Sequence, residues 1–408
     1  MRALFLTLVV YALAAVVLTA APAFAGQLTA FGDNPASQAP ASGWSTTPSL
    51  MVSRTYDDNV LLRGPGDLTI SDFITIVNPK GDVTYHGNHS EFAARYDGAF
   101  LMYQRSSDLN SFDQHGGVSF RRRLSKRNTF SVTADAQQSP TTELLQFVGV
   151  PYIRVGSFSD NVAAGLETTV SKRLSFVSRG HFQQVHFDDN QFSSLLFGGY
   201  SVGGGVGLRE RISAHTTLTA DYDFEHATIG TQDDMFDVQN GTIGLDHQLS
   251  EGMHVFAAGG FSRVNVGILG TPSTAPSWRL GLSDHYRATT IDINFSRSYV
   301  PSFGYGGTLQ NQELNASIKM PITRHIYTQA IAAWRKEDAI VFAAPELRTI
   351  WLQAVVGYTA RSWMRIEGYY ASTHQTVPSG TPGIFGNALM THDQIGIQVV
   401  AAKPVRIH

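Results

Sequence analysis

The chain of 408 residues contains no cysteine. This absence excludes disulfide bonds, thiolate chemistry and lipid attachment through an N-terminal cysteine. Charged residues are also scarce, at 15% of the chain, against roughly 25% in an average soluble protein. The formal net charge is only −3, so no nucleic-acid partner is expected.

Long hydrophobic runs are missing beyond the first residues. The chain opens MRALFLTLVVYALAAVVLTAAPAFAG, with an early charge at Arg2, an apolar run and a small-x-small ending at Ala25. This pattern predicts a secretory signal peptide, residues 1–25, cleaved after Ala25. An uncleaved membrane anchor is the alternative, because the apolar run approaches a spanning length.

Residues 26–46 are rich in alanine, serine, proline and glycine. This composition predicts a disordered periplasmic leader, because such a segment has too little apolar surface to form a packed core. The alternative for the leader is a functional arm that plugs a lumen or binds a partner.

The dominant pattern from Pro48 onward is an alternation of apolar and polar residues. In Glu91–Phe100, for example, Phe92, Ala94 and Tyr96 share one face, and the charged residues share the other. Many runs last roughly 9–13 residues, which is the length of a tilted membrane-crossing strand. Strands of soluble sandwiches are usually shorter, about 5–6 residues. Because no run keeps a helical stripe, the pattern predicts an all-β protein.

Short and long connections alternate between these runs. The short ones lie near Gly87, Ser125, Ser171, Ser213, Ser250, Arg287, Thr323 and Arg361. Counting the runs predicts a transmembrane antiparallel up-and-down β-barrel of about 18 strands (16–20), with short periplasmic turns and longer extracellular loops. The barrel is expected over residues 47–402, followed by a C-terminal tail, residues 403–408.

The polar faces of the runs supply the candidate pore-lining residues. They are Glu91, Arg95, Asp97, Arg121, Arg123, Asp135, Arg179, Arg209, Asp221, Asp223, Glu225, Asp292, Arg365 and Glu367. Side chains alone do not fill a barrel of this size, so water or an inserted loop must occupy the lumen. An aqueous lumen is favoured over a plugged one. Because acids and bases are both present, the sequence assigns no ion selectivity.

Other motifs give no catalytic, cofactor or metal site. Asp57-Asp58-Asn59 has oxygen ligands suited to Ca²⁺, but its residues are also ordinary turn formers. His181 and His186 fall on opposite faces of one strand. The run Gly203–Gly207 lacks the following Lys-Ser/Thr of a phosphate loop, so its glycines are expected to bend the strand or make room for a lumen contact. The chain is therefore not expected to be an enzyme.

The N-terminal part of the barrel region resembles a known family. Thr55–Leu61 (TYDDNVL), Ser71–Tyr85 (SDFITIVNPKGDVTY) and the turn LSKRNTF carry the likeness. They resemble β-barrel porins and outer-membrane barrels often encoded with exopolysaccharide systems in Gram-negative bacteria. The resemblance implies a barrel and suggests a pore or a role in saccharide export, and it assigns no functional residue. The ending IGIQVVAAKPVRIH departs from such barrels, because it lacks a final aromatic residue.

The expected function is passive, porin-like diffusion of small polar solutes through an aqueous lumen in the outer membrane. The alternative is a barrel with a plugged lumen that serves envelope polysaccharide export or a structural or surface-binding role. The expected partners are outer-membrane lipid and lipopolysaccharide, the barrel assembly machinery, and small polar solutes or saccharides. No cofactor is expected.

Overall fold

The computed structural model describes residues 42–64, 69–143, 149–188, 196–230, 234–266, 272–304, 306–340, 346–376 and 389–407. The strands are β1 (Gly43–Asp57), β2 (Asp72–His86), β3 (Ser90–Tyr103), β4 (Ser111–Arg123), β5 (Asn128–Ser139), β6 (Ser157–Thr169), β7 (Leu174–Phe187), β8 (Gly199–Arg211), β9 (Thr216–Ile229), β10 (Asp234–Gln248), β11 (Met253–Val266), β12 (Ser273–Tyr286), β13 (Thr289–Pro301), β14 (Thr308–Pro321), β15 (Ile326–Ala339), β16 (Leu347–Arg361), β17 (Met364–Thr376), β18 (Leu389–Ala402) and β19 (Val405–Ile407). Within these ranges the one helix is the single 3₁₀ turn η1 (Ser107–Leu109). No helix of the described chain is long and apolar enough to cross a membrane.

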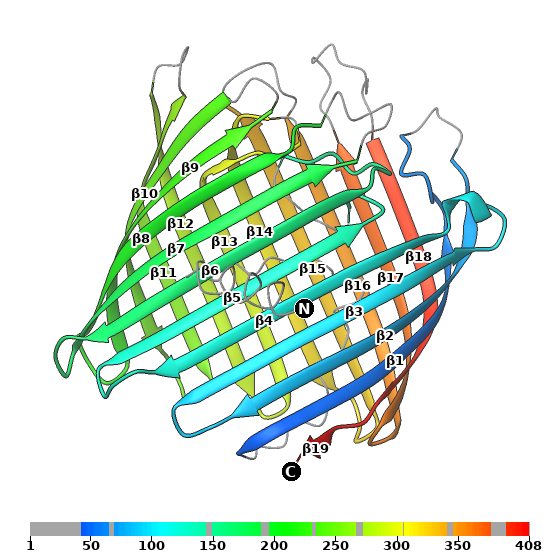
Figure 1. Ribbon diagram of the computed structural model, residues 1–408, viewed down its shortest axis with the longest axis horizontal. Coiled ribbons are helices and arrows are strands. Elements are labelled where there is room, and N and C mark those ends of the chain that lie inside the picture. The colour runs from blue at the N-terminus through cyan, green and yellow to red at the C-terminus, as the bar shows by residue number, and fades with distance from the viewer. Residues whose placement is uncertain are drawn as a thin grey trace, which may run out of the picture.

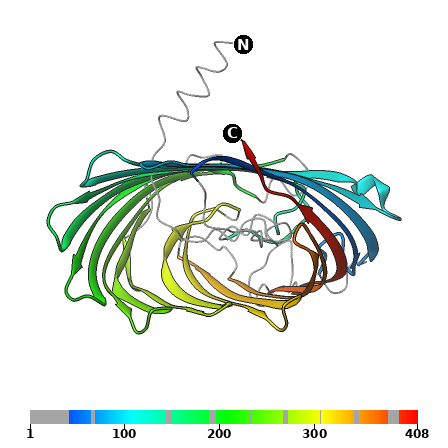
Figure 2. The ribbon, with the colours of Figure 1, turned by 90° about the horizontal axis from the view of Figure 1, so that it is seen from below.

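The strands form one closed barrel. Each of β1 to β18 pairs antiparallel with its neighbour in sequence, and β1 pairs with β18 from Ser49↔Ala402 to Asp57↔Gln394. The tilted strands are seen from the side in Figure 1, and Figure 2 shows the closed oval ring from below. The prediction of an antiparallel barrel of about 18 strands is therefore confirmed, with β19 as an addition.

The two ends of the barrel region differ from the sequence expectation. The first strand begins at Gly43, inside the predicted leader, because Trp44 packs against the rings of Tyr85 and Phe92 at centroid distances of 5.0 and 5.8 Å. In the predicted tail, β19 pairs with residues 44–46 of β1. Pro404 lacks a backbone N–H and separates β19 from β18. The predicted signal peptide lies outside the described residues.

The eight predicted short turns all connect neighbouring strands at one end of the barrel, called here the short-turn end. In four of them, near Ser125, Ser171, Ser213 and Ser250, the serine side chain accepts backbone hydrogen bonds within the turn. The Ser125 hydroxyl accepts hydrogen bonds from the backbone N–H groups of Arg127 and Asn128, both at 3.1 Å. Ser171 does the same for Arg173 and Leu174, at 3.2 and 3.1 Å. The repeated sequences LSKRNTF and VSKRLSF are therefore repeated turns.

The barrel exterior is apolar and its lumen side is polar. On β18, Ile395 and Ile397 are 60% and 63% exposed on the outside, while Gln394 and Gln398 are buried on the lumen side. A soluble barrel has the opposite arrangement, because apolar side chains on its outside would be exposed to water. This exterior is the surface expected of a barrel that lipid surrounds.

Candidate functional site

All predicted pore-lining residues lie on the lumen side of their strands. On β3, for example, Tyr96 and Phe100 are each 49% exposed on the exterior, so the alternate residues of this strand, Glu91, Arg95 and Asp97 among them, point inward. The fourteen residues are Glu91, Arg95, Asp97, Arg121, Arg123, Asp135, Arg179, Arg209, Asp221, Asp223, Glu225, Asp292, Arg365 and Glu367. Their role in permeation stays a prediction.

Three of the predicted residues meet across β8. Arg179 on β7 donates to Asp221 at 2.8 Å, and to both carboxylate oxygens of Asp223 at 2.6 and 2.7 Å. Both aspartates are on β9, so the guanidinium crosses the intervening strand. It can do so because β8 carries glycine on its lumen side, and a Cβ at Gly205 would overlap both Asp223 and Arg179. The glycine run therefore makes room for a lumen contact, as the sequence predicted.

A second cluster lies on β3 to β5. His115 has its Nδ1 atom 3.6 Å from Asp97 and its Nε2 atom 3.6 Å from Asp135. The sequence prediction included both aspartates and missed His115. Its position on the polar face of β4, two residues from Gly117, was the available signal.

The predicted pair on β17 forms a third cluster with residues of two other strands. Arg365 contacts Glu367 at 2.6 Å, and Glu367 also accepts hydrogen bonds from Tyr327 on β15 and Gln398 on β18. Both members of the pair are largely covered, at 9% and 2% side-chain exposure. This cluster therefore holds three strands together and presents little charge to the lumen.

Of the remaining predicted residues, five lie near the short-turn end, namely Glu91, Arg121, Arg123, Arg209 and Asp292, whereas Arg95 and Glu225 lie farther along β3 and β9. Glu91 on β3 is in register with Arg121 on β4. Asp292 accepts a hydrogen bond from the Ser283 hydroxyl at 2.8 Å. Exposed basic side chains gather at this end on β4 and β8, namely Arg121, Arg123, Arg209 and Arg211.

A feature that the sequence did not reveal is the inward course of the connection between β5 and β6, which the structure describes over residues 140–143 and 149–156. The backbone N–H of Gly149 donates to Glu337 on β15 at 2.9 Å, and that of Tyr152 donates to Gln375 on β17 at 2.7 Å. The connection therefore crosses the lumen from the β5–β6 wall to the opposite wall. Its cyan-green trace lies inside the ring in Figure 2. We call this segment the inward loop.

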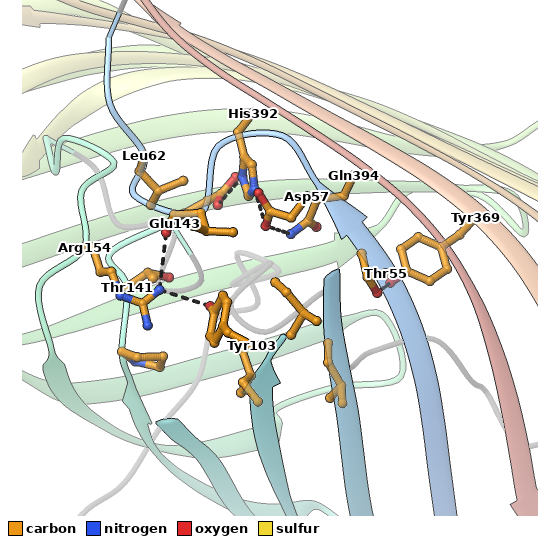
Figure 3. Close-up of a pocket in the computed structure, with 15 residues that line it drawn as sticks. Thr55, Asp57, Leu62, Tyr103, Thr141, Glu143, Arg154, Tyr369, His392 and Gln394 are labelled. Atoms are coloured by element: carbon orange, nitrogen blue, oxygen red, sulfur yellow. Dashed lines mark hydrogen bonds and ion pairs between the residues drawn. The ribbon is translucent and has the colours of Figure 1, made fainter. Parts of the chain in front are cut away.

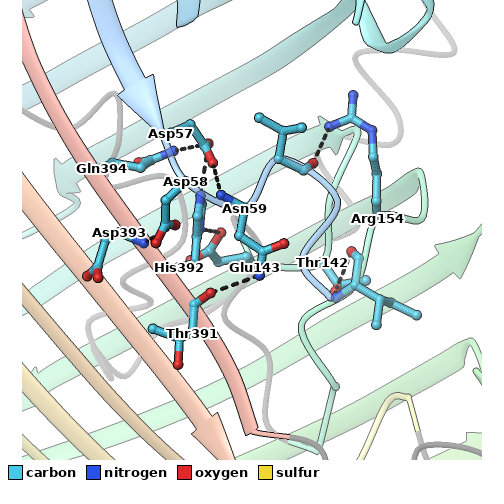
Figure 4. A network of polar contacts seen from close by, with 12 residues as sticks. Asp57, Asp58, Asn59, Thr142, Glu143, Arg154, Thr391, His392, Asp393 and Gln394 are labelled. Carbon is cyan, nitrogen blue, oxygen red and sulfur yellow. Dashed lines mark hydrogen bonds and ion pairs between the residues drawn. The ribbon is translucent and has the colours of Figure 1, made fainter. Parts of the chain in front are cut away.

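A buried histidine anchors the inward loop to the seam between β1 and β18. His392 has its Nδ1 atom 2.8 Å from Glu143 of the loop and its Nε2 atom 2.9 Å from Asp57 of β1. Gln394 donates to the same Asp57 oxygen at 2.9 Å, and Figure 4 shows the whole network. Because both ring nitrogens face carboxylates, the geometry is satisfied fully by the doubly protonated ring.

The turn after β1 is built by Asp57 and Asn59. The backbone N–H of Asn59 donates to Asp57 at 2.9 Å, and the Asn59 amide donates to the Thr391 carbonyl at 2.8 Å. These bonds favour the turn interpretation of Asp57-Asp58-Asn59, and no group of potential metal ligands occurs among the described residues. Burial raises the pKa of the neighbouring Asp58, although the backbone N–H of Asp393 donates to it.

A small pocket lies beneath this anchor. Arg154 of the inward loop spans one side and donates to Tyr103 at 3.0 Å and to the Leu109 carbonyl at 2.6 Å. Its guanidinium also stacks over the Tyr103 ring at 5.0 Å. In Figure 3 the Asp57–Glu143–His392 cluster faces this arginine across the pocket. Most of the polar groups that line this space are already hydrogen-bonded to other residues. It is therefore a gap between the contacts that anchor the loop.

An apolar cluster packs the inward loop against the long-loop end of the barrel. Val150 and Val155 of the loop contact this cluster, which also contains Phe236 of β10 and Phe303 beyond β13. Two other connections join there, since the backbones of Phe197 and Gly304 exchange hydrogen bonds of 2.6 and 2.9 Å. Part of the long-loop half of the lumen is thus filled with protein.

Charged groups midway along the barrel are accessible to solvent. The side chains of Asp135, Asp223 and Glu225 are 47%, 33% and 22% exposed, although all three point into the lumen. Since the barrel is closed, solvent at these side chains is solvent inside it. In the described part of the chain, protein therefore narrows the lumen in its long-loop half, and the middle of the lumen is accessible to solvent.

Comparisons with known proteins gave structural likenesses only. No protein-family model and no curated protein sequence matches the chain. Among solved structures, Acinetobacter baumannii OccAB4 is 8% identical with a TM-score of 0.47, covering 89% of this chain and 99% of that one. Pseudomonas aeruginosa OccK3 (OpdO) is 12% identical with a TM-score of 0.44, covering 88% and 96%. With identities and TM-scores this low, no residue role or activity is carried over.

Proposed function

We propose that the chain is a channel of the outer membrane through which small polar solutes diffuse passively. The observation that carries the proposal is the set of solvent-exposed carboxylates midway along a closed barrel. The apolar exterior supports a membrane location, because lipid is the phase that such a surface requires. The inward loop narrows the passage and so limits the size of the solute.

The cellular setting follows from the same proposal. The predicted signal peptide with cleavage after Ala25 would export the chain, and the barrel assembly machinery would insert it beside lipopolysaccharide in the outer membrane of a Gram-negative bacterium. The short-turn end would face the periplasm and the long loops the outside. Small polar solutes, saccharides among them, are the proposed cargo. Transport would need no catalysis and no cofactor.

Nothing in the described residues favours the alternative of polysaccharide export. The inward loop fills only part of the lumen, because charged side chains on the β5–β9 wall remain exposed to solvent inside the barrel. A structural barrel with a fully plugged lumen would cover these groups.

Liposome swelling tests the proposal. Vesicles that contain the purified full chain are diluted into iso-osmotic solutions of glycine, glucose and a trisaccharide. The proposal predicts swelling that is fast with the smallest solute and slows as solute size rises. Swelling no faster than that of protein-free vesicles, with folded barrel confirmed in the same vesicles by protease resistance, would overturn it.

A further inference from the structure

Negative charge is exposed midway along the lumen, on the wall formed by β5 to β9. Arg179, the strong base on this part of the wall, has a side chain that is only 6% exposed. The two aspartates that it binds are more open, with Asp221 at 23% and Asp223 at 33%. The guanidinium lies beneath the carboxylates because the β8 glycines, which have no side chain, leave space for it. A solute therefore meets the acids before it meets the base.

Neighbouring groups on the same wall extend this pattern. Asp135 has the most exposed side chain of the set, at 47%, while its partner His115 is 16% exposed. Glu225, at 22%, lies 3.6 Å from His181. With both histidines neutral, Arg179 is the one permanent cation in contact with these four carboxylates, and with both protonated the contacting groups still leave an excess of one negative charge. We call Asp135, Asp221, Asp223 and Glu225 the acidic face.

Most lumen-side bases elsewhere at this level stand beside acids, although the exposed Arg279 on the lumen side of β12 is in register with Ala258 and Ser296. On β2 and β3, Lys80 is in register with Asp97, and Arg95 with Asp82, so the basic groups there stand beside acids. On the opposite wall, Arg335 is 13% exposed between Glu313 and Glu337. Lys80, Arg95 and Arg335 are therefore balanced locally.

The basic residues of the short-turn end act over a different stretch of the path. Arg123 and Arg211 are the last residues of their strands, whereas Asp135 and Asp223 lie near the middle of theirs. Arg209 comes nearest to the acidic face, because it is in register with Thr219, two residues before Asp221. Screening limits the reach of an exposed charge to about 8 Å at physiological ionic strength. A solute at Asp135, Asp223 and Glu225, which lie farther from the short-turn end, therefore feels mainly the carboxylates.

We propose that the acidic face makes the lumen selective for cations, so that small organic cations such as amines and guanidinium compounds pass more readily than carboxylates. This inference rests on the proposed function, because selectivity requires an open passage. Carboxylates in a partly desolvated lumen concentrate counter-ions and repel anions, which is how charge rings select ions in channels. No covalent step and no bound cofactor is involved.

The reversal potential in a potassium chloride gradient tests the inference. Purified full chain in a planar bilayer is expected to show a reversal potential displaced toward the potassium equilibrium potential. The double variant Asp135→Asn/Asp223→Asn should shift it toward zero. The control Asp237→Asn removes one carboxylate from the outer side of β10, and it should leave the potential unchanged.

The outcomes separate the inference from the proposed function. Conductance with a reversal potential at zero, or displaced toward chloride, overturns cation selectivity and leaves the channel intact. A bilayer without conductance overturns both. The wild-type measurement alone decides the sign, so the test does not depend on the double variant folding. A double variant that conducts with unchanged selectivity would show that other groups set the preference and would overturn the assignment to the acidic face.

Discussion

At the scale of single residues, glycine on the lumen side of β8 decides which side chains can cross that strand. Cβ atoms at Gly203, Gly205 and Gly207 would collide with His181, Asp223 and Asp221, respectively. Arg179 therefore reaches two carboxylates on β9 that it could not contact over a strand with larger side chains. The conformational freedom of glycine is not needed here, because the strand is regular and only the missing Cβ matters.

We expect Gly205→Ala to destabilise the barrel. The added methyl group must displace Asp223 or Arg179, and overpacking of this kind costs about 1–3 kcal/mol. The free energy of unfolding, measured by guanidinium titration in detergent micelles, reports the loss. The control is Gly241→Ala on β10, where a Cβ has no neighbour within 4 Å. Equal stability of the two variants would contradict the crossing contact.

At the scale of elements, the inward loop depends on a few polar anchors, one near its start and others farther along. Glu143 reaches His392 near one end, and Gly149 and Tyr152 donate to Glu337 and Gln375 farther along. Burial raises the pKa of the Tyr152 phenol, so this side chain stays neutral within the packed loop. The loop is thus a fixed constriction with identifiable attachments.

We expect Glu143→Ala to loosen the inward loop. Removing one partner of a buried charge pair costs about 3–5 kcal/mol, which corresponds to at least about a hundredfold loss of protection where the loop opens locally. Hydrogen–deuterium exchange of the peptide covering residues 149–156 measures this loss. Glu251→Ala, at an exposed position in a short turn, is the control. Unchanged exchange in the first variant would contradict the anchor.

The pairing of the final strand β19 with β1 leads to a prediction about the closure of the barrel between β1 and β18. Deleting residues 403–408 removes its pairing with Trp44–Thr46, while the register between β1 and β18 from Ser49 to Asp57 remains. We expect a closed barrel that unfolds at a lower temperature than the full chain. Heat-modified migration in gel electrophoresis measures that temperature. A truncated chain that never acquires the folded migration would show that β19 is required for closure.

At the scale of the whole molecule, the sequence predicted the barrel better than its interior. The period of two in runs such as Glu91–Phe100 follows directly from strand geometry, and the turns recur with serine in the same place, so strand number and facing could be predicted. The contacts that fix the inward loop could not. Glu143 and His392 are 249 positions apart, and no local pattern marks either as a partner. Interior contacts depend on which walls face each other after closure.

The central claim is that a water-filled path runs through the closed barrel past the inward loop. Single-channel recording from purified full chain in a planar bilayer tests this claim most directly. We predict discrete, ohmic conductance steps that grow as the salt concentration rises, because ions carry the current through water in the lumen. A folded barrel that inserts into the bilayer and gives no conductance steps at any salt concentration would contradict it.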